Sequence, residues 1–373
     1  MVERLTENTD TERARVGIVD ADIHNALPSL SILKDYLPTR WQRQLEMIGP
    51  RGPHGFMYGS TKYPKVAPAI SRADAWPPSG ATPGSDLEFM QMQHLDALGV
   101  EYGILNCLVE HVGHELNEEW AAAMARAIND WQIAEWLEKD SRLRASILVP
   151  FQYPELAAQE IDRLGDHPGF VQVLVLTRTM EPLGRRKYWK MYEAAERYGL
   201  TIGIHASSAT GTPPTPSGWP SYYLEEHVVI SQAAQAQVTS LVCEGVFEQF
   251  PDLRAVFLEG GFAWLPPLMW RLDKHYTRLK DEVPHLKRPP SEYIRDHIWI
   301  STQPIEEPDD PDHLLQAIKH LGADDKILFA TDYPHWDFDD PRRAFPAKMP
   351  KELKRKIFSE NARKLYGFDG SGG

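Results

Sequence analysis

Carboxylate and imidazole side chains directly follow four apolar segments that lie far apart in this sequence. Asp22 and His24 follow the first segment, and His205, Glu259 and Asp332 follow three later ones. Burying an unpaired charge costs free energy, so we expect such side chains at buried strand ends to share a ligand. One divalent cation held by Asp22, His24, His205 and Asp332 would neutralise both carboxylates and occupy both imidazoles. It would also lower the pKa of a bound water towards neutrality, as in metal-dependent hydrolysis.

Two further carboxylates near these segments have other expected roles. Glu259 precedes the pair Gly260-Gly261. It either accepts backbone N–H groups or takes part in proton transfer or substrate contact. Asp20 should lie on the same strand face as Asp22 but deeper in the fold, where we expect it to be a structural acceptor.

Three more side chains are candidates for substrate binding. Arg178 follows the fourth apolar segment, where it would either pair with a substrate carboxylate or remain a solvated loop charge. His335 would support a metal ligand, contact the substrate or lie at the surface, and the first of these is favoured. Trp336 is expected in the wall of the pocket.

Eight apolar segments are predicted to be strands, each followed by a helix or by a segment long enough to hold one. The predicted strands are about 16–24, 102–107, 143–151, 170–176, 200–207, 253–261, 298–304 and 327–332. The predicted helices are 86–98, 115–140, 154–165, 187–198, 222–250, 264–279, 311–321 and 351–365. Alternating strands and helices indicate a parallel sheet, and eight such units favour a (β/α)8 barrel of the α/β class. Catalytic groups of such barrels gather at the carboxyl ends of the strands, where the candidate ligands lie.

The predicted domain organisation is one barrel with two loop features. We expect a flexible tail at 1–15, a single domain at 16–368 and a frayed end at 369–373. Within the domain, 25–98 reads as a loop insertion or lid after the first strand. A proline-rich loop at 209–220 follows the fifth strand.

The composition and charge of the chain disfavour several classes of partner. The formal net charge of −13 over 373 residues disfavours nucleic acid and membrane surfaces, which attract basic proteins. Two cysteines do not make a disulfide framework, so a cytoplasmic location is expected. The polar beginning of the chain does not resemble a secretory signal, and no segment has the length and apolarity of a membrane span. The expected ligand is a small molecule.

Five motifs together resemble the amidohydrolase superfamily, in the amidohydrolase-related branch that includes aminocarboxymuconate semialdehyde decarboxylase. They are DADIHN at 20–25, GIHAS at 203–207, GVFEQFPDLRAVFLEGGFAWLPPLMWRLD at 245–273, ATDYPHWD at 330–337 and SENARKLYGF at 359–368. The resemblance runs from Val16 to Phe368. It implies a (β/α)8 barrel with one divalent metal ion, zinc first and manganese second. It also implies a homodimer or larger homo-oligomer that acts on aromatic or unsaturated carboxylic acids.

The resemblance also implies roles for the candidate residues. Asp22 and His24 match the ligand pair of the first strand, and His205 matches the ligand of the fifth. Asp332 matches the aspartate of the eighth strand, which binds metal and takes a proton from metal-bound water in hydrolytic members. Many decarboxylases of this branch have histidine where this chain has Glu259, so we expect a metal-dependent hydrolase first. The alternatives are a nonoxidative decarboxylase and a non-catalytic barrel that acts as a binding protein.

Overall fold

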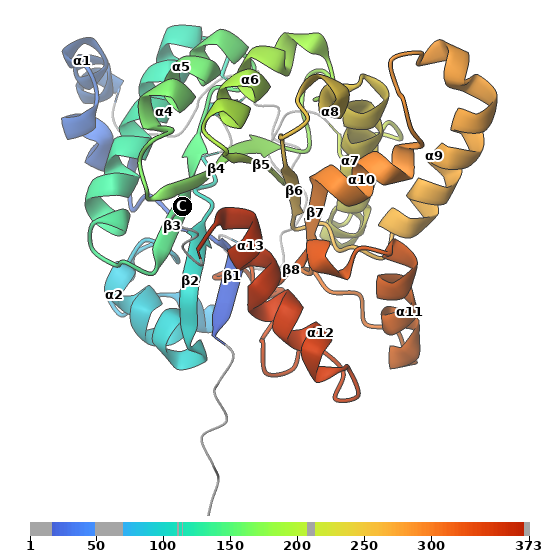
Figure 1. The fold of residues 1–373 in the computed structure, drawn as a ribbon. Helices are drawn as coiled ribbons and strands as arrows, with labels where there is room; N and C mark the ends of the chain where they lie inside the picture. The colour runs from blue at the N-terminus through green and yellow to red at the C-terminus, as the bar shows by residue number, and fades with distance from the viewer. Residues whose placement is uncertain (1–16, 49–69, 110–111, 114, 207–212, 369–373) are drawn as a thin grey trace, which may run out of the picture.

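Eight parallel strands form a barrel surrounded by helices in the computed structural model of this chain (Figure 1). The structure describes residues 17–48, 70–109, 112–113, 115–206 and 213–368. The strands follow the sheet in chain order, from β1 to β8. Their bounds are β1 Ile18–Ile23, β2 Val100–Leu105, β3 Leu143–Leu148, β4 Phe170–Leu176, β5 Thr201–His205, β6 Ala255–Leu258, β7 Ile298–Ser301 and β8 Ile327–Leu328.

Backbone hydrogen bonds between β1 and the segment that follows β8 close the barrel. The amide of Ala21 donates to the carbonyl of Phe329 at 2.9 Å, and the amide of Asp332 donates to the carbonyl of Asp22 at 3.1 Å. The amide of His24 donates to the carbonyl of Tyr333 at 2.7 Å. These bonds bring the first and last candidate ligands of the chain side by side. The predicted α/β fold class and (β/α)8 architecture are confirmed.

The helices cover the outside of the barrel (Figure 1). They are α1 Thr39–Ile48, α2 Leu87–Met90, α4 Glu118–Gln132, α5 Pro154–Leu164, α6 Trp189–Arg197, α7 Tyr223–Cys243, α8 Val246–Gln249, α9 Leu265–Leu279, α10 Pro290–His297, α11 Pro311–Leu321, α12 Lys351–Arg355 and α13 Asn361–Tyr366. Wider helical turns extend three of them, at Gln91–Asp96, Ile133–Leu137 and Lys356–Glu360.

Two helical segments differ from the sequence prediction. The predicted helix 222–250 divides into α7 and α8 at Gly245, whose φ of 76° is the left-handed conformation that ends helices. Helix α10 was not predicted. It begins at Pro290, where a proline lacks an amide that the first helical turn would leave unpaired anyway.

Helix α13 closes the end of the barrel opposite to the candidate ligands. Ala362 and Leu365 of this helix pack with Val19, Val256 and Leu328, which belong to three strands. The carbonyl of Leu365 accepts a hydrogen bond at 2.9 Å from Arg254, the residue before β6. The amino ends of the strands are therefore covered by the C-terminal helix, and their carboxyl ends are left for the site.

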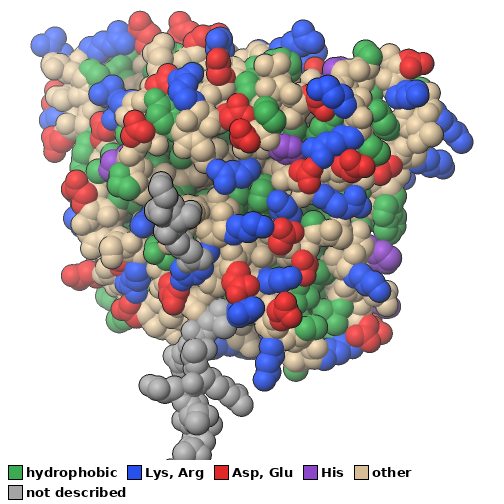
Figure 2. Space-filling model, in the orientation of Figure 1, with side chains coloured by type: hydrophobic (Ala, Val, Ile, Leu, Met, Phe, Trp, Pro, Cys, Tyr) green, Lys and Arg blue, Asp and Glu red, His purple; other side chains and the backbone are tan. Residues whose placement is uncertain are grey.

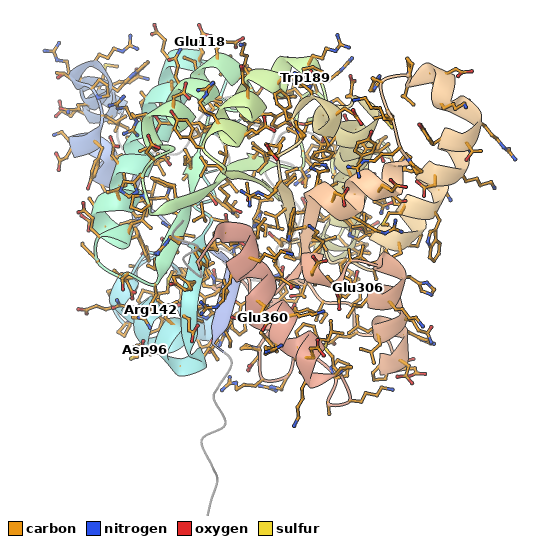
Figure 3. The ribbon with its side chains drawn as sticks, viewed as in Figure 1. Asp96, Glu118, Arg142, Trp189, Glu306 and Glu360 are labelled. Carbon is orange, nitrogen blue, oxygen red and sulfur yellow. The ribbon has the colours of Figure 1, made fainter. Side chains whose placement is uncertain are left out.

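The surface carries charges of both signs. Figure 2 shows Lys and Arg side chains interspersed with Asp and Glu side chains across one face of the molecule. Some of them form peripheral ion pairs, such as the 2.6 Å contact of Arg142 with Asp96 (Figure 3). No helix among the described residues has the length and apolarity needed to cross a membrane.

Several predictions about the domain organisation stay predictions. The tail 1–15 and the end 369–373 lie outside the described residues. Part of the 25–98 segment also lies outside them, and its described part includes α1, α2 and a 3₁₀ helix at Leu30–Tyr36. Its role as a lid stays a prediction.

Candidate metal centre

The first two candidate ligands lie at the carboxyl end of β1, where the strand is irregular. The pairing of β1 with β2 shifts register between Asp20 and Ile23. Asp22 contacts Asn106 and His205, whereas Asp20 accepts hydrogen bonds from His94, at 2.8 Å, and from the amide and hydroxyl of Thr331. The expected alternation is therefore interrupted, and the two aspartates have separate partners. The prediction that Asp20 is a structural acceptor is confirmed.

Two candidate site residues have a left-handed backbone. Glu259 has a φ of 55° and Asp332 a φ of 62°. In the described part of the chain, Ile70 is the one other non-glycine residue with a positive φ. Side chains disfavour this conformation, and such strain is concentrated at functional sites. Here it occurs where β6 and β8 meet the loops that follow them.

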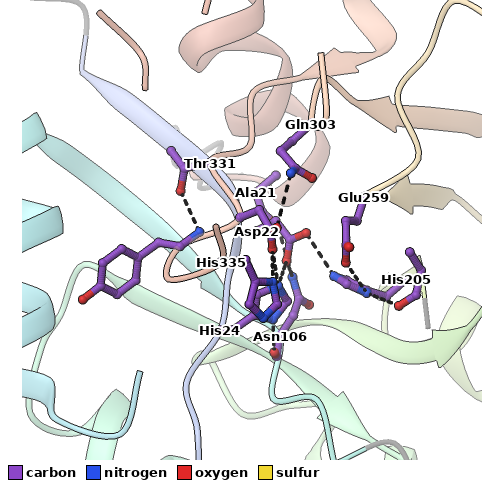
Figure 4. Close-up of polar contacts among 12 residues, drawn as sticks. Ala21, Asp22, His24, Asn106, His205, Glu259, Gln303, Thr331 and His335 are labelled. Atoms are coloured by element: carbon purple, nitrogen blue, oxygen red, sulfur yellow. Dashed lines mark hydrogen bonds and ion pairs between the residues drawn. The ribbon is translucent and has the colours of Figure 1, made fainter. Parts of the chain in front are cut away.

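Asp22, His24 and His205 lie close together at this end of the barrel (Figure 4), and Asp332, from the segment after β8, contacts His24. The Nε2 atom of His24 lies 2.7 Å from Oδ1 of Asp332 and 3.5 Å from Oδ1 of Asp22. The Nε2 atom of His205 lies 3.0 Å from Oδ2 of Asp22. Asp22, His205 and Asp332 are fully buried, and His24 is 5% exposed. The four residues predicted as metal ligands are thus brought together.

The arrangement of these side chains fits a divalent cation. One oxygen or nitrogen from each of Asp22, His24 and His205 lies within 4.8 Å of the others. The same holds for a second set, made of His24, Glu259, Asp332 and His335. The predicted four-ligand group is thus divided between two overlapping sets that share His24. Carboxylate and imidazole donors without thiolate suit zinc and manganese alike.

Two residues that the sequence analysis did not single out support the ligands. Asn106 follows β2, donates from Nδ2 to Oδ1 of Asp22 at 2.8 Å, and accepts from Nδ1 of His24 at its carbonyl, also at 2.8 Å. The second bond leaves Nε2 of His24 directed at the centre. Gln303 follows β7 and donates to Oδ2 of Asp332 at 3.2 Å. Both are polar side chains within two residues after the end of a barrel strand, and this position in the sequence could have identified them.

Opposite charges shift the pKa values of these groups strongly. Burial lowers the pKa of His24, but Asp22 and Asp332 outweigh it and raise the pKa to about 9. Burial likewise lowers the pKa of His205, which Asp22 raises to about 9. Burial raises the pKa of Asp332, but His335 and His24 hold it well below its usual value. The carboxylates thus favour positive charge on their neighbours, so protons and metal ions compete for this centre.

Glu259 and His335 border the converging ligands. Oε2 of Glu259 lies 3.5 Å from Nδ1 of His205, and the side chain is 14% exposed. Burial first, and the charge of Asp332 second, raise the pKa of Glu259 well above its usual value. The Nδ1 atom of His335 lies 2.7 Å from Oδ1 of Asp332, and its ring stacks on His24 with centroids 4.4 Å apart.

A cavity of about 310 Å³ opens beside His24 and His335. Its described lining also includes Leu27, Leu30, Pro83, Leu108, Val109 and Pro334 on the apolar side, and Asn25, Ala26, Ser71, Thr82 and Cys107. This volume and the partly apolar lining suit a small molecule.

The two remaining substrate candidates have partners of their own. Arg178 is 6% exposed and lies 3.2 Å from Glu226, which is 2% exposed and belongs to α7. Trp336 donates from its indole to the hydroxyl of Tyr223 at 3.2 Å and leaves 37% of its surface exposed. A substrate contact of either residue stays a prediction.

Histidine and carboxylate side chains that converge at the carboxyl end of a parallel (β/α)8 barrel lie where the active sites of enzymes with this fold are found. The amidohydrolase family matches residues 19–368 of this sequence. The chain therefore belongs to the amidohydrolase family, and the resemblance found in the sequence is confirmed.

The curated relatives narrow the comparison within that family. A gamma-resorcylate decarboxylase from Polaromonas sp. is 26% identical over 290 residues, which cover 75% of this chain and 87% of that protein. A 2-amino-3-carboxymuconate-6-semialdehyde decarboxylase from Dictyostelium discoideum is 22% identical over 248 residues, 66% of each chain. These relatives correct the order of the two reactions in the sequence analysis, because they are decarboxylases. Placing hydrolysis first, on the one difference at Glu259, was wrong.

Solved structures share the fold. The dihydroxybenzoic acid decarboxylase from Polaromonas sp., with bound manganese and 2-nitroresorcinol, has a TM-score of 0.66 at 20% identity, covering 95% of this chain and 98% of its own. The 5-carboxyvanillate decarboxylase from Sphingomonas paucimobilis has a TM-score of 0.67 at 20% identity, covering 94% and 99%. At these identities the likeness shows the barrel fold.

Proposed function

We propose that this protein is a metal-dependent, nonoxidative decarboxylase of an aromatic carboxylic acid. The observation that carries the proposal is the convergence of Asp22, His24, His205 and Asp332 beside a cavity large enough for one substituted ring. The curated relatives, which act on gamma-resorcylate or on a carboxymuconate semialdehyde, support decarboxylation as the reaction.

One divalent cation would be held by these four side chains. Manganese becomes the first choice and zinc the second, because a solved relative holds manganese. When bound, the cation would supply positive charge to the substrate carboxylate and to a neighbouring oxygen. Elemental analysis of purified protein tests this assignment, with about one manganese or zinc ion per chain as the expected result.

Glu259 is the proposed proton-handling group. Decarboxylation replaces the carboxyl group of the ring by hydrogen, so a proton must reach the ring carbon while the electron pair of the broken bond remains with the ring. Glu259 lies at the end of β6, next to His205 and beside the converging ligands. A mostly buried carboxyl at this point is suited to deliver that proton.

The test is a panel of hydroxylated benzoates incubated with the manganese-loaded protein in D₂O. We expect release of one CO₂ per substrate and one deuterium on the ring carbon that carried the carboxylate. His205→Asn should abolish turnover, whereas His320→Asn, at an exposed position on α11, is the matched control. Incorporation of ¹⁸O from labelled water into the product, without release of CO₂, would overturn the proposal.

Assembly into a homodimer or larger homo-oligomer stays a prediction. Light scattering coupled to size-exclusion chromatography tests it directly. A monomer at all accessible concentrations would contradict it.

A further inference from the structure

A line of polar side chains crosses the interior of the barrel, from the partly buried Tyr366 of the C-terminal helix to the candidate metal centre. It contains Tyr366 of α13, Gln172 of β4, Ser146 of β3 and Asn106 after β2, and it ends at Asp22. Asn106 and Gln172 are fully buried, and Ser146 is 1% exposed. Burying polar side chains inside the barrel costs free energy unless each of them finds a hydrogen-bond partner.

Each member donates towards the metal centre. The hydroxyl of Tyr366 donates to Oε1 of Gln172 at 3.0 Å, and Nε2 of Gln172 donates to Oδ1 of Asn106 at 2.9 Å and to Oγ of Ser146 at 2.7 Å. Ser146 donates in turn to Oδ1 of Asn106 at 2.5 Å. Asn106 then donates from Nδ2 to Oδ1 of Asp22 at 2.8 Å.

The charge of Asp22 forces this direction. A carboxylate can only accept, so Asn106 must present its NH₂ group to Asp22 and its oxygen to Ser146 and Gln172. Gln172 must then donate with its own NH₂ group, which leaves its oxygen for the hydroxyl of Tyr366. Burial, and then the charge of Asp22, raises the pKa of Tyr366, so the phenol keeps the proton that it donates.

The neighbouring backbone leaves space for this line. Gly203 of β5 faces Gln172, and a Cβ atom at Gly203 would lie 2.9 Å from Nε2 of Gln172. Tyr366 is held from the other side, because Arg363 of the same helix forms an ion pair with Glu101 at β2 and Leu365 is bonded to Arg254. The positions of Gln172 and Tyr366 are thus both fixed by the residues around them.

We infer that Tyr366, Gln172, Ser146 and Asn106 form a directional donor chain that positions Asp22 as a metal ligand, so that the C-terminal helix sets the metal affinity of the centre. The inference rests on the proposed metal centre. Aligned donors polarise one another, and partners behind the ligands tune metal affinity in such centres. Tyr366 acts on the centre only through the other members and is a positioning residue.

The test measures Mn²⁺ affinity by competition with a chelating dye, together with the melting temperature. Gln172→Met should weaken Mn²⁺ binding by roughly 10-fold to 100-fold. Tyr366→Phe removes one hydroxyl at the far end and should weaken it by about 3-fold to 10-fold. Ser146→Ala should have a similar effect. If Gln172→Met does not fold, Ser146→Ala and Tyr366→Phe together test the inference.

Tyr192→Phe is the matched control. Tyr192 is fully buried, and its hydroxyl donates at 2.7 Å to the carbonyl of Leu183, a residue outside the donor chain. This variant should lose stability as Tyr366→Phe does but should keep wild-type Mn²⁺ affinity. Unchanged affinity in Tyr366→Phe and Ser146→Ala would overturn the donor chain and leave the metal centre intact. If the wild-type protein binds neither Mn²⁺ nor Zn²⁺, the metal centre and the donor chain both fail.

Discussion

The Nε2 atom of His24 lies 2.7 Å from Oδ1 of Asp332, although 308 positions separate the two residues in the chain. The contact exists because the backbone of β1 bonds to the segment after β8 and closes the barrel. Barrel closure therefore assembles the centre. A substitution that breaks these backbone hydrogen bonds should weaken metal binding before it disturbs the outer helices.

Removal of a ligand should release the metal without unfolding the barrel. Asp22→Asn keeps the volume of the side chain but removes its charge. We expect it to lower Mn²⁺ affinity by at least roughly 100-fold, since even partners behind a ligand contribute 10-fold to 100-fold. Metal content after dialysis is the measurement. Asp312→Asn, on the exposed side of α11, should retain the metal, and retention by Asp22→Asn would remove Asp22 from the ligand set.

Glu259→Gln should separate proton transfer from metal binding. With the acid removed, we expect kcat to fall by about 100-fold or more, because positioned acids and bases contribute factors of this size. Metal content should stay at the wild-type level. Glu306→Gln is the control, since Glu306 is also a carboxyl with a pKa raised by burial, but it accepts from the amides of Phe262 and Ala263 instead. Loss of the metal in Glu259→Gln would make Glu259 a ligand.

Arg178 and Glu226 form a buried ion pair, and we expect the stability of the fold to depend on it. Arg178→Met leaves Glu226 buried beside an apolar side chain. Burial already raises the pKa of Glu226 to about 7, so it can take up a proton, and we expect the free energy of unfolding to fall by about 1 to 3 kcal/mol. The double variant with Glu226→Leu should recover most of this loss in urea titrations. The exposed pair of Lys190 and Glu193 is the control, where Lys190→Met should cost less than about 1 kcal/mol.

The same variants test the predicted substrate contact of Arg178. If Arg178 also binds the substrate carboxylate, the stable double variant should keep a raised KM. A wild-type KM in that variant would show that Arg178 only supports the fold.

Asp339 should make the stability of the protein depend on pH. Burial first, and then the charges of Asp337 and Asp332, raise its pKa from 3.8 to about 7, although the amide of Ile305 opposes the shift. The folded protein thus binds this proton more tightly than the unfolded chain does. The stability that this proton contributes is complete below pH 4 and is lost as the pH rises through about 7.

Asp339→Asn should remove this pH dependence. The difference in unfolding free energy between the variant and the wild type should shift in favour of the variant by about 4 kcal/mol between pH 4 and pH 8. Asp340→Asn is the control with the opposite sign, because Arg342 lowers the pKa of Asp340. Parallel stability curves for wild type and Asp339→Asn would contradict the prediction.

Apolar runs and the polar residues that end them were enough to predict the barrel. The eight strands lie within a few residues of their predicted bounds, because each is a short apolar segment followed by turn-forming residues. The break at Gly245 and the helix α10 were missed, since a single left-handed glycine and an eight-residue amphipathic segment leave a weak periodic pattern.

The sequence alone determined which side chains are available at the carboxyl ends of the strands, because parallel strands place their ends at one edge. It did not determine the partners of those side chains. Asn106, Gln303 and Tyr366 are ordinary polar residues until barrel closure and the docking of α13 bring them to Asp22, Asp332 and Gln172, respectively. Their hydrogen bonds join segments far apart in the chain, so only the tertiary structure shows which polar groups are buried together and which way each must donate.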